Sequence, residues 1–264
     1  MYHPVITLLS DMGPGNPSVA MAKAILMDCA PGVGIFDISH NVSQYDLQQA
    51  AYLLSAACPH FPKGTVHILL VDVFRGSTHR ILVAEKEGYY FIAPDNGILP
   101  LAFGDETGDT RLCFEFDGAC AFKEWISKAG QVIEKIKQGN GFPAFPLCDI
   151  KKAPRILQPK VMPDGVECNI LYIDHYENVT LDIKQPQFES LLNGKAFKIK
   201  ISRAQGVAHI SHNYNEVDKG EPLCRFNAAG YLEIALNHGK AASLLGLGAY
   251  QTGNLQYQTI KILF

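Results

Sequence analysis

An acidic residue, Asp11, lies where an α/β protein usually keeps its ligand crevice. It begins the turn Asp11-Met-Gly-Pro-Gly-Asn-Pro-Ser18, which separates an apolar, strand-like run from a run with helical spacing. A carboxylate repels phosphate but accepts two hydroxyl hydrogen bonds at once, which suits a vicinal diol. The turn has neither the lysine of a P-loop nor G-x-G-x-x-G spacing, which disfavours a phosphate site. A role for Asp11 in capping the turn is an equally good interpretation.

A second acidic residue, Asp72, follows the strongly β-type run 65–71, in the segment Asp72-Val-Phe-Arg75-Gly-Ser-Thr-His79-Arg80. Arg75, His79 and Arg80 can each carry positive charge, so this segment could orient a nucleophile. Loops collect charged residues in any case, and a solvated hairpin loop explains the same pattern.

Two further polar segments interrupt the predicted strands. The segment Ala93-Pro-Asp-Asn-Gly97 has the composition of a tight turn, and we interpret it as structural. The segment Ile173-Asp-His-Tyr-Glu-Asn178 places polar and aromatic residues between two strands. His175 has no partner at metal-ligand spacing, so the sequence gives little support for a metal site.

The elements that position these residues differ between the two halves of the chain. In the first half, strand-like and helix-like runs alternate, which predicts a layered sheet covered by helices. The expected strands are 5–10, 33–38 and 65–71, the expected helices begin at Ser18, Asp46 and Phe122, and 80–85 with 89–93 form an expected hairpin. The hairpin predicts an antiparallel part of the sheet.

From about Gln158 onward, short strands follow one another at close spacing, with turn residues between them. They are expected at 165–173, 179–183, 196–201, 222–227, 232–236 and 256–264. The sequence therefore predicts an α/β N-terminal domain, 1–155, followed by a smaller all-β, barrel-like C-terminal domain, 156–264.

Composition excludes several classes of protein. The 264 residues are 47% hydrophobic and 19% charged, which is too apolar for a disordered chain. A net charge of −3 gives no positive field for nucleic acid or an anionic membrane, and the apolar N-terminal stretch is too short for a membrane span. Seven cysteines, none in a C-x-x-C pair, favour buried thiols in a reducing cytoplasm.

Eight ordered segments carry a resemblance that runs along nearly the whole chain. They are Leu8-Leu-Ser-Asp11-Met-Gly13, Asp37-Ile-Ser-His40, Asp46 with Gln48-Gln-Ala-Ala51, Phe61-Pro-Lys-Gly-Thr-Val-His67, Ala93-Pro-Asp-Asn-Gly97, Tyr172-Ile-Asp174 with Asn178, Gly220-Glu-Pro-Leu223 and Gly230-Tyr-Leu-Glu-Ile-Ala-Leu-Asn237. In these segments the chain resembles the S-adenosylmethionine hydroxide adenosyltransferases, whose relatives include fluorinase and chlorinase.

The resemblance implies roles for nine ligand-binding residues. Asp11 falls at the carboxylate that holds the ribose diol, the role that its chemistry already suggested. Asp174, Tyr176 and Asn178 resemble the loop that holds the methionine portion. Tyr214 falls at an aromatic position near adenine. Asn227 and Asn237 are the first and last residues of a segment that reads the adenine edge and the amino-acid end. Ser18 and Tyr45 fall near the ribose and stacking positions.

The catalytic segments depart from the family pattern. Family hydrolases have an Asp-Pro-Gly-Val-Gly-Thr loop followed by Arg, and later a His-Gly-Arg-Asp segment. Only the first Asp is unchanged here, as Asp72, while His79 falls at the Arg position and Asp117 at the His position. Asp72, His79 and Asp117 could form a carboxylate–imidazole–carboxylate cluster, and Arg75 could restore the missing charge. Alternatively, the two acids could make the pocket favour a sulfonium cation over hydroxide.

The resemblance implies an S-adenosylmethionine hydrolase that forms adenosine and methionine by displacement at the ribose C5′. It needs neither metal nor cofactor, and it is a homotrimer with sites between the N-domain of one subunit and the C-domain of the next. One alternative is a non-catalytic S-adenosylmethionine or adenosine sensor, which the altered loop favours. A halide-dependent adenosyltransferase is a weaker alternative, since Asp72 would repel an anion.

Overall fold

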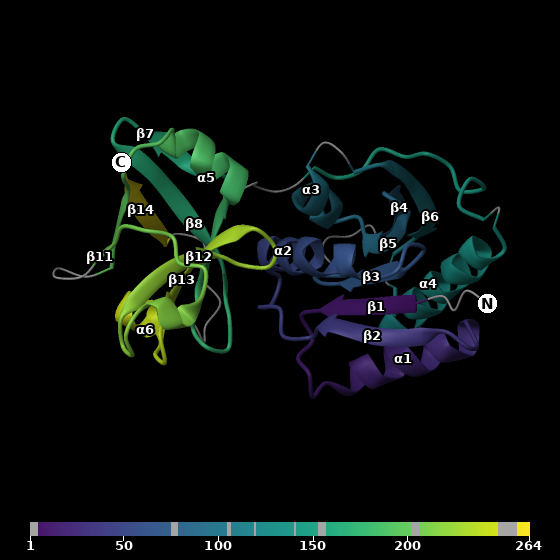
Figure 1. Cartoon of the computed structure of the whole chain (residues 1–264). Helices are drawn as coiled ribbons and strands as arrows, with labels where there is room; N and C mark the ends of the chain where they lie inside the picture. Colours follow the sequence, from purple (N-terminus) through teal and green to yellow (C-terminus); the bar gives the residue numbers. More distant parts are fainter. Residues whose placement is uncertain are drawn as a thin grey trace. The chain divides into compact units, whose positions relative to one another are not determined.

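The chain folds into two compact units, Met1–Ile156 and Leu157–Phe264, which are described separately (Figure 1). The computed structural model describes residues 5–74, 79–104, 107–118, 120–139, 141–152, 157–201, 206–247 and 258–264.

The N-terminal unit is built on a six-stranded sheet with the order β2-β1-β3-β5-β4-β6. Its strands are β1 (Val5–Ser10), β2 (Gly34–Ser39), β3 (Val66–Leu70), β4 (His79–Lys86), β5 (Tyr89–Pro94) and β6 (Asp109–Phe116). The first four strands in this order are parallel, whereas β4 pairs antiparallel with both β5 and β6. The predicted hairpin and the predicted antiparallel part of the sheet are confirmed.

Helices cover both faces of this sheet. They are α1 (Pro17–Cys29), α2 (Leu47–Ala57), α3 (Ile98–Phe103) and α4 (Phe122–Lys137), with a 3₁₀ turn at Cys58–His60. Helices α1 and α4 pack together over one face, and α2 and α3 over the other (Figure 1). Along β3, alternate residues enter opposite cores: Ile68 and Leu70 pack with α1 and α4, and Leu69 packs with α2. This is the layered α/β unit that the alternating runs predicted.

One strand of this sheet was not predicted. Strand β6 follows the turn-rich residues after Gly104, and its residues do not alternate regularly, since Leu112, Cys113 and Phe114 stand together between Arg111 and Glu115. It is an edge strand, so its pairing with β4 rather than its own composition specifies it.

The C-terminal unit is an antiparallel sheet that nearly closes into a barrel. Its strands are β7 (Lys160–Met162), β8 (Gly165–Ile173), β9 (Val179–Lys184), β10 (Lys198–Lys200), β11 (Gly206–Val207), β12 (Pro222–Phe226), β13 (Tyr231–Leu236) and β14 (Thr259–Leu263). The order is β11-β10-β14-β8-β9-β13-β12, and β7 pairs with β8. A single bridge between Ile210 and Cys224 connects the chain beyond β11 to β12. The predicted barrel-like domain is confirmed.

Short helical segments lie among the strands of this unit. They are α5 (Gln185–Leu192), α6 (Ala241–Leu244) and the 3₁₀ turn η2 (Tyr214–Glu216). Phe188 of α5 packs into the barrel core with Phe197 and Phe226. The barrel therefore uses one helix face to complete its apolar interior.

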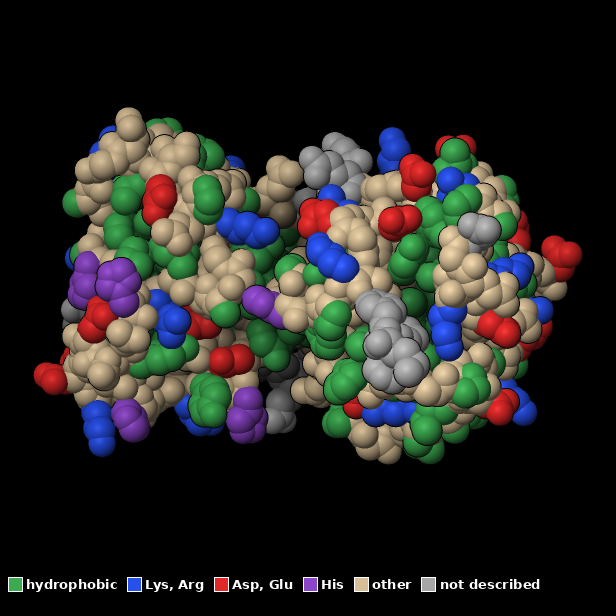
Figure 2. All heavy atoms as spheres, turned by 45° about the vertical axis from the view of Figure 1, so that its right-hand side comes forward, with side chains coloured by type: hydrophobic (Ala, Val, Ile, Leu, Met, Phe, Trp, Pro, Cys, Tyr) green, Lys and Arg blue, Asp and Glu red, His purple; other side chains and the backbone are tan. Residues whose placement is uncertain are grey.

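The described surface has mixed charge. On the face drawn in Figure 2, Lys and Arg side chains are interspersed with Asp and Glu side chains, in keeping with the small net charge. Within the described ranges, no helix combines the length and the apolar character needed to cross a membrane.

A buried histidine in β3 makes the stability of the N-terminal unit depend on pH. His67 is fully buried, its Nδ1 lies 2.7 Å from Thr7 Oγ1, and its ring stacks on Phe91. Burial lowers the pKa of His67 to about 4. The unfolded chain, with a histidine pKa near 6.5, therefore binds more protons than the folded chain between pH 6.5 and pH 4.

We expect the free energy of unfolding to fall as the pH falls through this window. The slope from one histidine is about 1.4 kcal/mol per pH unit, or on the order of 3 kcal/mol in total. Urea titrations of His67→Asn should show a flatter pH dependence than those of the parent, while the exposed control His60→Asn keeps the parent slope. Equal slopes in His67→Asn and the parent would contradict this account.

Candidate functional site

The sequence-predicted residues of the N-terminal unit gather at one edge of its sheet. Asp11 follows β1 and Asp72 follows β3, both at the carboxyl ends of parallel strands. Because β4 runs antiparallel to β5, its first residue, His79, lies at this edge too, and Asp117 follows the end of β6 opposite it. Tyr45 reaches the same edge from the loop after β2. Ligands bind at this edge in open α/β sheets.

The Asp11 carboxylate connects two of these loops. Its Oδ2 accepts hydrogen bonds from the backbone N–H of Tyr45 at 3.0 Å and of Asp72 at 3.3 Å. These bonds reach 34 and 61 residues along the chain, whereas the turn after β1 is capped at the start of α1 by Asn16, so they differ from the local capping role that the sequence offered as an alternative. A carboxylate has about four acceptor positions, so Asp11 keeps capacity for a ligand.

Strained backbone collects at the candidate site. In the described part of the chain, the non-glycine residues with positive φ include Tyr45 (62°), Asp72 (47°), Glu177 (63°) and His238 (53°). Each lies in a loop that carries predicted site residues. Such conformations cost about 1–3 kcal/mol and concentrate at functional sites, where surrounding contacts enforce them.

A polar chain that runs from buried Ser10 and His40 to exposed Asp37 supports the turn that carries Asp11. Ser10 Oγ lies 2.7 Å from His40 Nδ1, and His40 Nε2 lies 3.0 Å from Asp37. Asp37 also pairs with Lys23 at 2.6 Å. Partial burial raises the pKa of Asp37, but the hydrogen bonds from Lys23 and His40 outweigh it and lower that pKa below its usual value. The Asp37-Ile-Ser-His40 motif thus supports the turn after β1 through the contact between His40 and Ser10.

The predicted catalytic residues are spread along the sheet edge. Strands β3 and β4 are separated by β5, so Asp72 and His79 leave the sheet about 10 Å apart, whereas His79 and Asp117 leave adjacent strands. Phe74 bridges the first gap, because its ring contacts the His79 ring edge-on at 5.6 Å. His79 Nδ1 is buried without a hydrogen-bond partner among the described residues. Asp117 is exposed, three strands away from Asp72.

Two arginines, Arg75 and Arg80, lie near the position where the family has its catalytic arginine and this chain has His79. Arg80 donates to Asp95 at 2.7 Å and to the carbonyl of Asp149 at 3.1 Å, so its guanidinium anchors the segment after α4. The alternative in which Arg80 supplies the catalytic charge is therefore not supported. Arg75 lies outside the described residues. Ser18, half-buried in the first turn of α1, donates its backbone N–H to Asn16.

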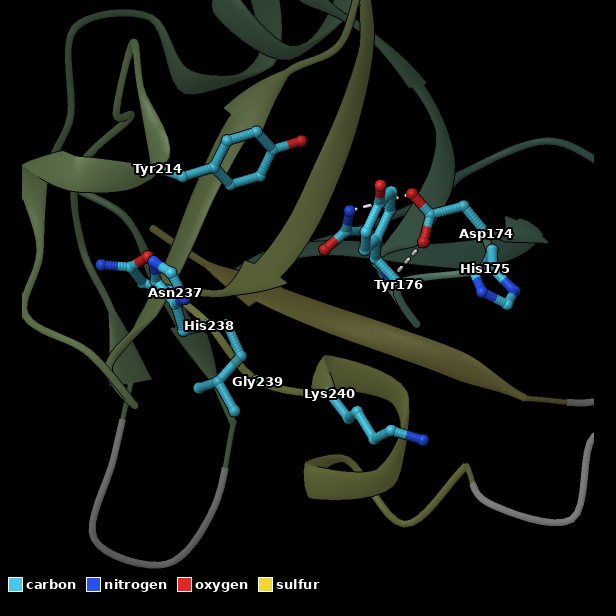
Figure 3. Close-up of a pocket in the computed structure, with 10 residues that line it drawn as sticks. Asp174, His175, Tyr176, Tyr214, Asn237, His238, Gly239 and Lys240 are labelled. Carbon is cyan, nitrogen blue, oxygen red and sulfur yellow. Dashed lines mark hydrogen bonds between the residues drawn. The ribbon is translucent and has the colours of Figure 1, made fainter.

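The C-terminal unit contains a pocket of about 740 Å³ that brings together most of the residues predicted there. The side chains come from the β8–β9 loop, from η2 and from the segment after β13, and they surround one space (Figure 3). The residues that line it are Asp174, His175, Tyr176, Asn178, Tyr214, Leu236, Asn237, His238, Gly239 and Lys240. Asn227 is not among them: its Oδ1 accepts the N–H groups of Ala229 and Tyr231 in the β12–β13 turn.

The β8–β9 loop is held rigidly at two points. The Asp174 carboxylate accepts the backbone N–H of Asn178 at 2.8 Å and its side-chain amide at 2.9 Å. Glu177 accepts Lys240 Nζ at 2.7 Å and the hydroxyl and N–H of Ser243 in α6. Between these anchors, Tyr176 is 74% exposed, and its ring meets that of His175 edge-on with the ring centres 6.0 Å apart.

A second aromatic ring, that of Tyr214, is also fixed in place. Its hydroxyl donates to Glu233 at 2.9 Å, and the Arg225 guanidinium lies 4.8 Å from the ring centre. Glu233 and Arg225 face each other across β12 and β13. Burial, followed by the charge of Glu233, raises the pKa of Tyr214, so this hydroxyl remains a neutral donor.

Sequence reasoning missed three residues of this pocket. His238, Gly239 and Lys240 directly follow Asn237, and only their position at the end of a predicted strand could have indicated them. His175 lines the pocket, but within the described residues no group of three or more His, Cys, Asp or Glu side chains is arranged around a metal position. The pocket offers aromatic faces, amides, one carboxylate and one ammonium group.

Comparison with known proteins identifies the family of this chain. The chain matches the SAM hydroxide adenosyltransferase N-terminal domain over residues 6–128 and the corresponding C-terminal domain over residues 168–252. It is 27% identical to the (R)-S-adenosyl-L-methionine hydrolase of Thermus thermophilus, over 92% of this chain and 95% of that protein. It is 28% identical to a fluorinase of an Actinoplanes species, over 89% and 91% of the two chains.

Solved structures share the fold along the whole chain. An uncharacterized conserved protein of Thermotoga maritima superposes with a TM-score of 0.77 at 24% identity, covering 98% of this chain and 100% of that one. A conserved hypothetical protein of Thermus thermophilus gives a TM-score of 0.70 at 25% identity, covering 99% of each chain. The two domain matches and these folds show that the chain belongs to the SAM hydroxide adenosyltransferase family.

Proposed function

We propose that this protein hydrolyses S-adenosylmethionine to adenosine and methionine. The observation that carries the proposal is the Asp11 carboxylate, which lies at the ligand edge of the sheet and connects the Tyr45 and Asp72 loops. A carboxylate there suits the ribose diol, and the loop that it fixes carries Asp72, the one residue of the family nucleophile loop that is unchanged. The hydrolase names of its relatives support the same reaction.

The C-terminal pocket suits the rest of this substrate. Tyr176 and Tyr214 offer aromatic faces for a purine or for the sulfonium cation, which is attracted to an aromatic ring. Asn178 and Asn237 provide amides for polar groups, although Asn178 is partly engaged by Asp174 and Asn237 donates to the Val217 carbonyl. Lys240 is engaged by Glu177, so Asn237 and the aromatic rings are the groups that we assign to the ligand.

The reaction is an in-line displacement at C5′. The oxygen of water or hydroxide forms the new bond to C5′ as the C5′–S bond breaks, and the electron pair of that bond neutralises the sulfonium to give the thioether of methionine. The leaving group is already good, so the protein has to desolvate and align the oxygen nucleophile. We assign Asp72 to orient the water and His79 to accept its proton, since an imidazole accepts protons near neutral pH.

Asp117 and Arg75 have lesser parts in this proposal. Asp117 leaves the strand beside His79 and would stabilise the imidazolium once it forms. Arg75 belongs to the same loop as Asp72, and we keep it as the candidate for the missing positive charge. No metal or other cofactor is part of the proposed mechanism.

The seven cysteines support a cytoplasmic location for this reaction. All are free thiols, and burial raises the pKa of Cys58, to about 11, and of Cys224, to about 12. Such thiols are weak nucleophiles and are expected in a reducing compartment.

The direct test is incubation with S-adenosylmethionine, followed by chromatography. We expect adenosine and methionine in equal amounts, with no 5′-halo-adenosine when chloride, bromide or fluoride is added. Formation of a halo-nucleoside would replace the hydrolase proposal by the halide-dependent one. Tight binding of intact S-adenosylmethionine without turnover would instead identify a sensor.

Substitution of the assigned catalytic residues should separate turnover from binding. Asp72→Asn keeps a side chain that tolerates positive φ, and His79→Asn removes the proton acceptor. We expect each to lower kcat by about 10²–10⁴-fold, with affinity for adenosine within about threefold of the parent, because the lost interaction acts mainly in the transition state. The exposed control Asp28→Asn should match the parent. Full activity in His79→Asn would remove His79 from the mechanism.

We propose that the protein is a homotrimer in which the N-terminal unit of one subunit and the C-terminal unit of the next complete each site. The site residues of each unit include an exposed aromatic side chain, since Tyr45 is 67% exposed in the N-terminal unit and Tyr176 is 74% exposed in the C-terminal unit. Exposed rings of this kind support contact with a neighbouring subunit. Light scattering should give three times the mass of one chain. A monomer that turns over substrate would contradict this assembly.

A further inference from the structure

The backbone at Asp72 has a conformation that its own residue type disfavours. Its φ is 47°, in the left-handed region, where an L side chain crowds the following carbonyl. A segment of this kind returns to an extended or right-handed conformation unless contacts on both sides prevent it. The contacts around Asp72 therefore decide where its carboxylate points.

The N–H and the C=O of Asp72 are each held by a different side chain. On one side, Asp11 Oδ2 accepts the Asp72 N–H at 3.3 Å. On the other, Asn96 Nδ2 donates to the carbonyl of Asp72 at 3.2 Å and to that of Val71 at 2.9 Å. Asn96 lies 24 residues further along the chain, in the turn after β5.

Asn96 is itself fixed. It is 6% exposed, its Oδ1 accepts the N–H of Ile98 at the start of α3 at 3.2 Å, and its own N–H donates to the Pro94 carbonyl at 3.0 Å. One side chain thus supplies two donors to the Asp72 loop and one acceptor to α3. An aspartate would lose both donors, and an alanine would leave buried carbonyls without their partner.

We propose that Asn96 is a positioning residue that fixes the left-handed conformation of Asp72 and so aims its carboxylate at the nucleophile. The expected effect on kcat rests on the proposed hydrolase function. The expected effect on the Asp72 backbone does not. It gives the Ala93-Pro-Asp-Asn-Gly97 motif two separate duties: Asp95 anchors Arg80, and Asn96 holds the Asp72 loop.

The test compares Asn96→Asp and Asn96→Ser with the parent in two measurements. Steady-state kinetics with S-adenosylmethionine should show kcat reduced at least tenfold with KM within about threefold. Hydrogen exchange followed by mass spectrometry should show faster exchange at residues 70–74, because the Asp72 N–H is no longer held against Asp11. Asn96→Ser, a smaller change, keeps the test open if Asn96→Asp does not fold.

The matched control is Asn169→Ala, in the C-terminal unit. Asn169 also donates two hydrogen bonds from its side-chain amide, to Gln158 and to Asp182, and both partners belong to the C-terminal unit. We expect this control to lower thermal stability while kcat and the exchange at 70–74 stay at parent values.

Parent-like kcat, or unchanged exchange at 70–74, in a folded Asn96 variant would overturn the assignment. A parent that does not turn over S-adenosylmethionine would refute the proposed function instead, and the exchange measurement would then decide the role of Asn96 without it.

Discussion

The N-terminal half-site depends on one carboxylate that accepts hydrogen bonds from two distant loops. Asp11 Oδ2 receives the N–H groups of Tyr45 and Asp72, both of which have positive φ. Charge-assisted hydrogen bonds of this kind are about twice as strong as neutral ones, and they stabilise conformations that the two residues would not adopt alone. Without the negative charge at this position, the Tyr45 and Asp72 loops would lose a side chain that bonds to both. The order of the sheet brings the loops near, Asp11 connects them, and Asn96 holds the Asp72 loop from its other side.

The two units contribute different chemistry. The N-terminal unit presents carboxylates and an imidazole along a sheet edge, supported from behind by the Ser10, His40 and Asp37 chain. The C-terminal unit presents a pocket with two tyrosine rings, of which Tyr214 is held by Glu233 and Arg225 and Tyr176 lies on a loop that is anchored at both ends. Rigid groups lose little conformational entropy when a ligand binds, so a modest number of polar contacts suffices. The proposed substrate, S-adenosylmethionine, needs both kinds of group: a carboxylate for its ribose diol, and aromatic rings for its adenine or its sulfonium cation.

Much of this arrangement could be predicted from local pattern. Apolar, β-rich runs predicted most strands of both units, and the family resemblance, rather than local pattern, indicated the polar segment between β8 and β9 as a ligand loop. What could not be predicted was the use of each polar residue, since that depends on contacts between residues far apart in sequence. Local sequence does not indicate that the Arg80 guanidinium pairs with Asp95. It does not indicate either that the Asn227 side chain bonds within its own turn, and the part of Asn227 in ligand binding stays a prediction. Strand β6 was not predicted because charged residues flank its apolar residues without a period of two, and its pairing with β4 is what specifies it.

The loop that carries Tyr176 is attached to α6 by both backbone and side-chain hydrogen bonds. The Glu177 carbonyl accepts the Ala242 N–H at 2.9 Å, and the Glu177 carboxylate accepts Lys240 Nζ and the Ser243 hydroxyl. An exposed ion pair contributes little to global stability. Substitution of Lys240 or Ser243 would therefore remove only the side-chain part of this attachment, so the direction of the Tyr176 loop can be altered while the backbone hydrogen bond still joins it to the barrel.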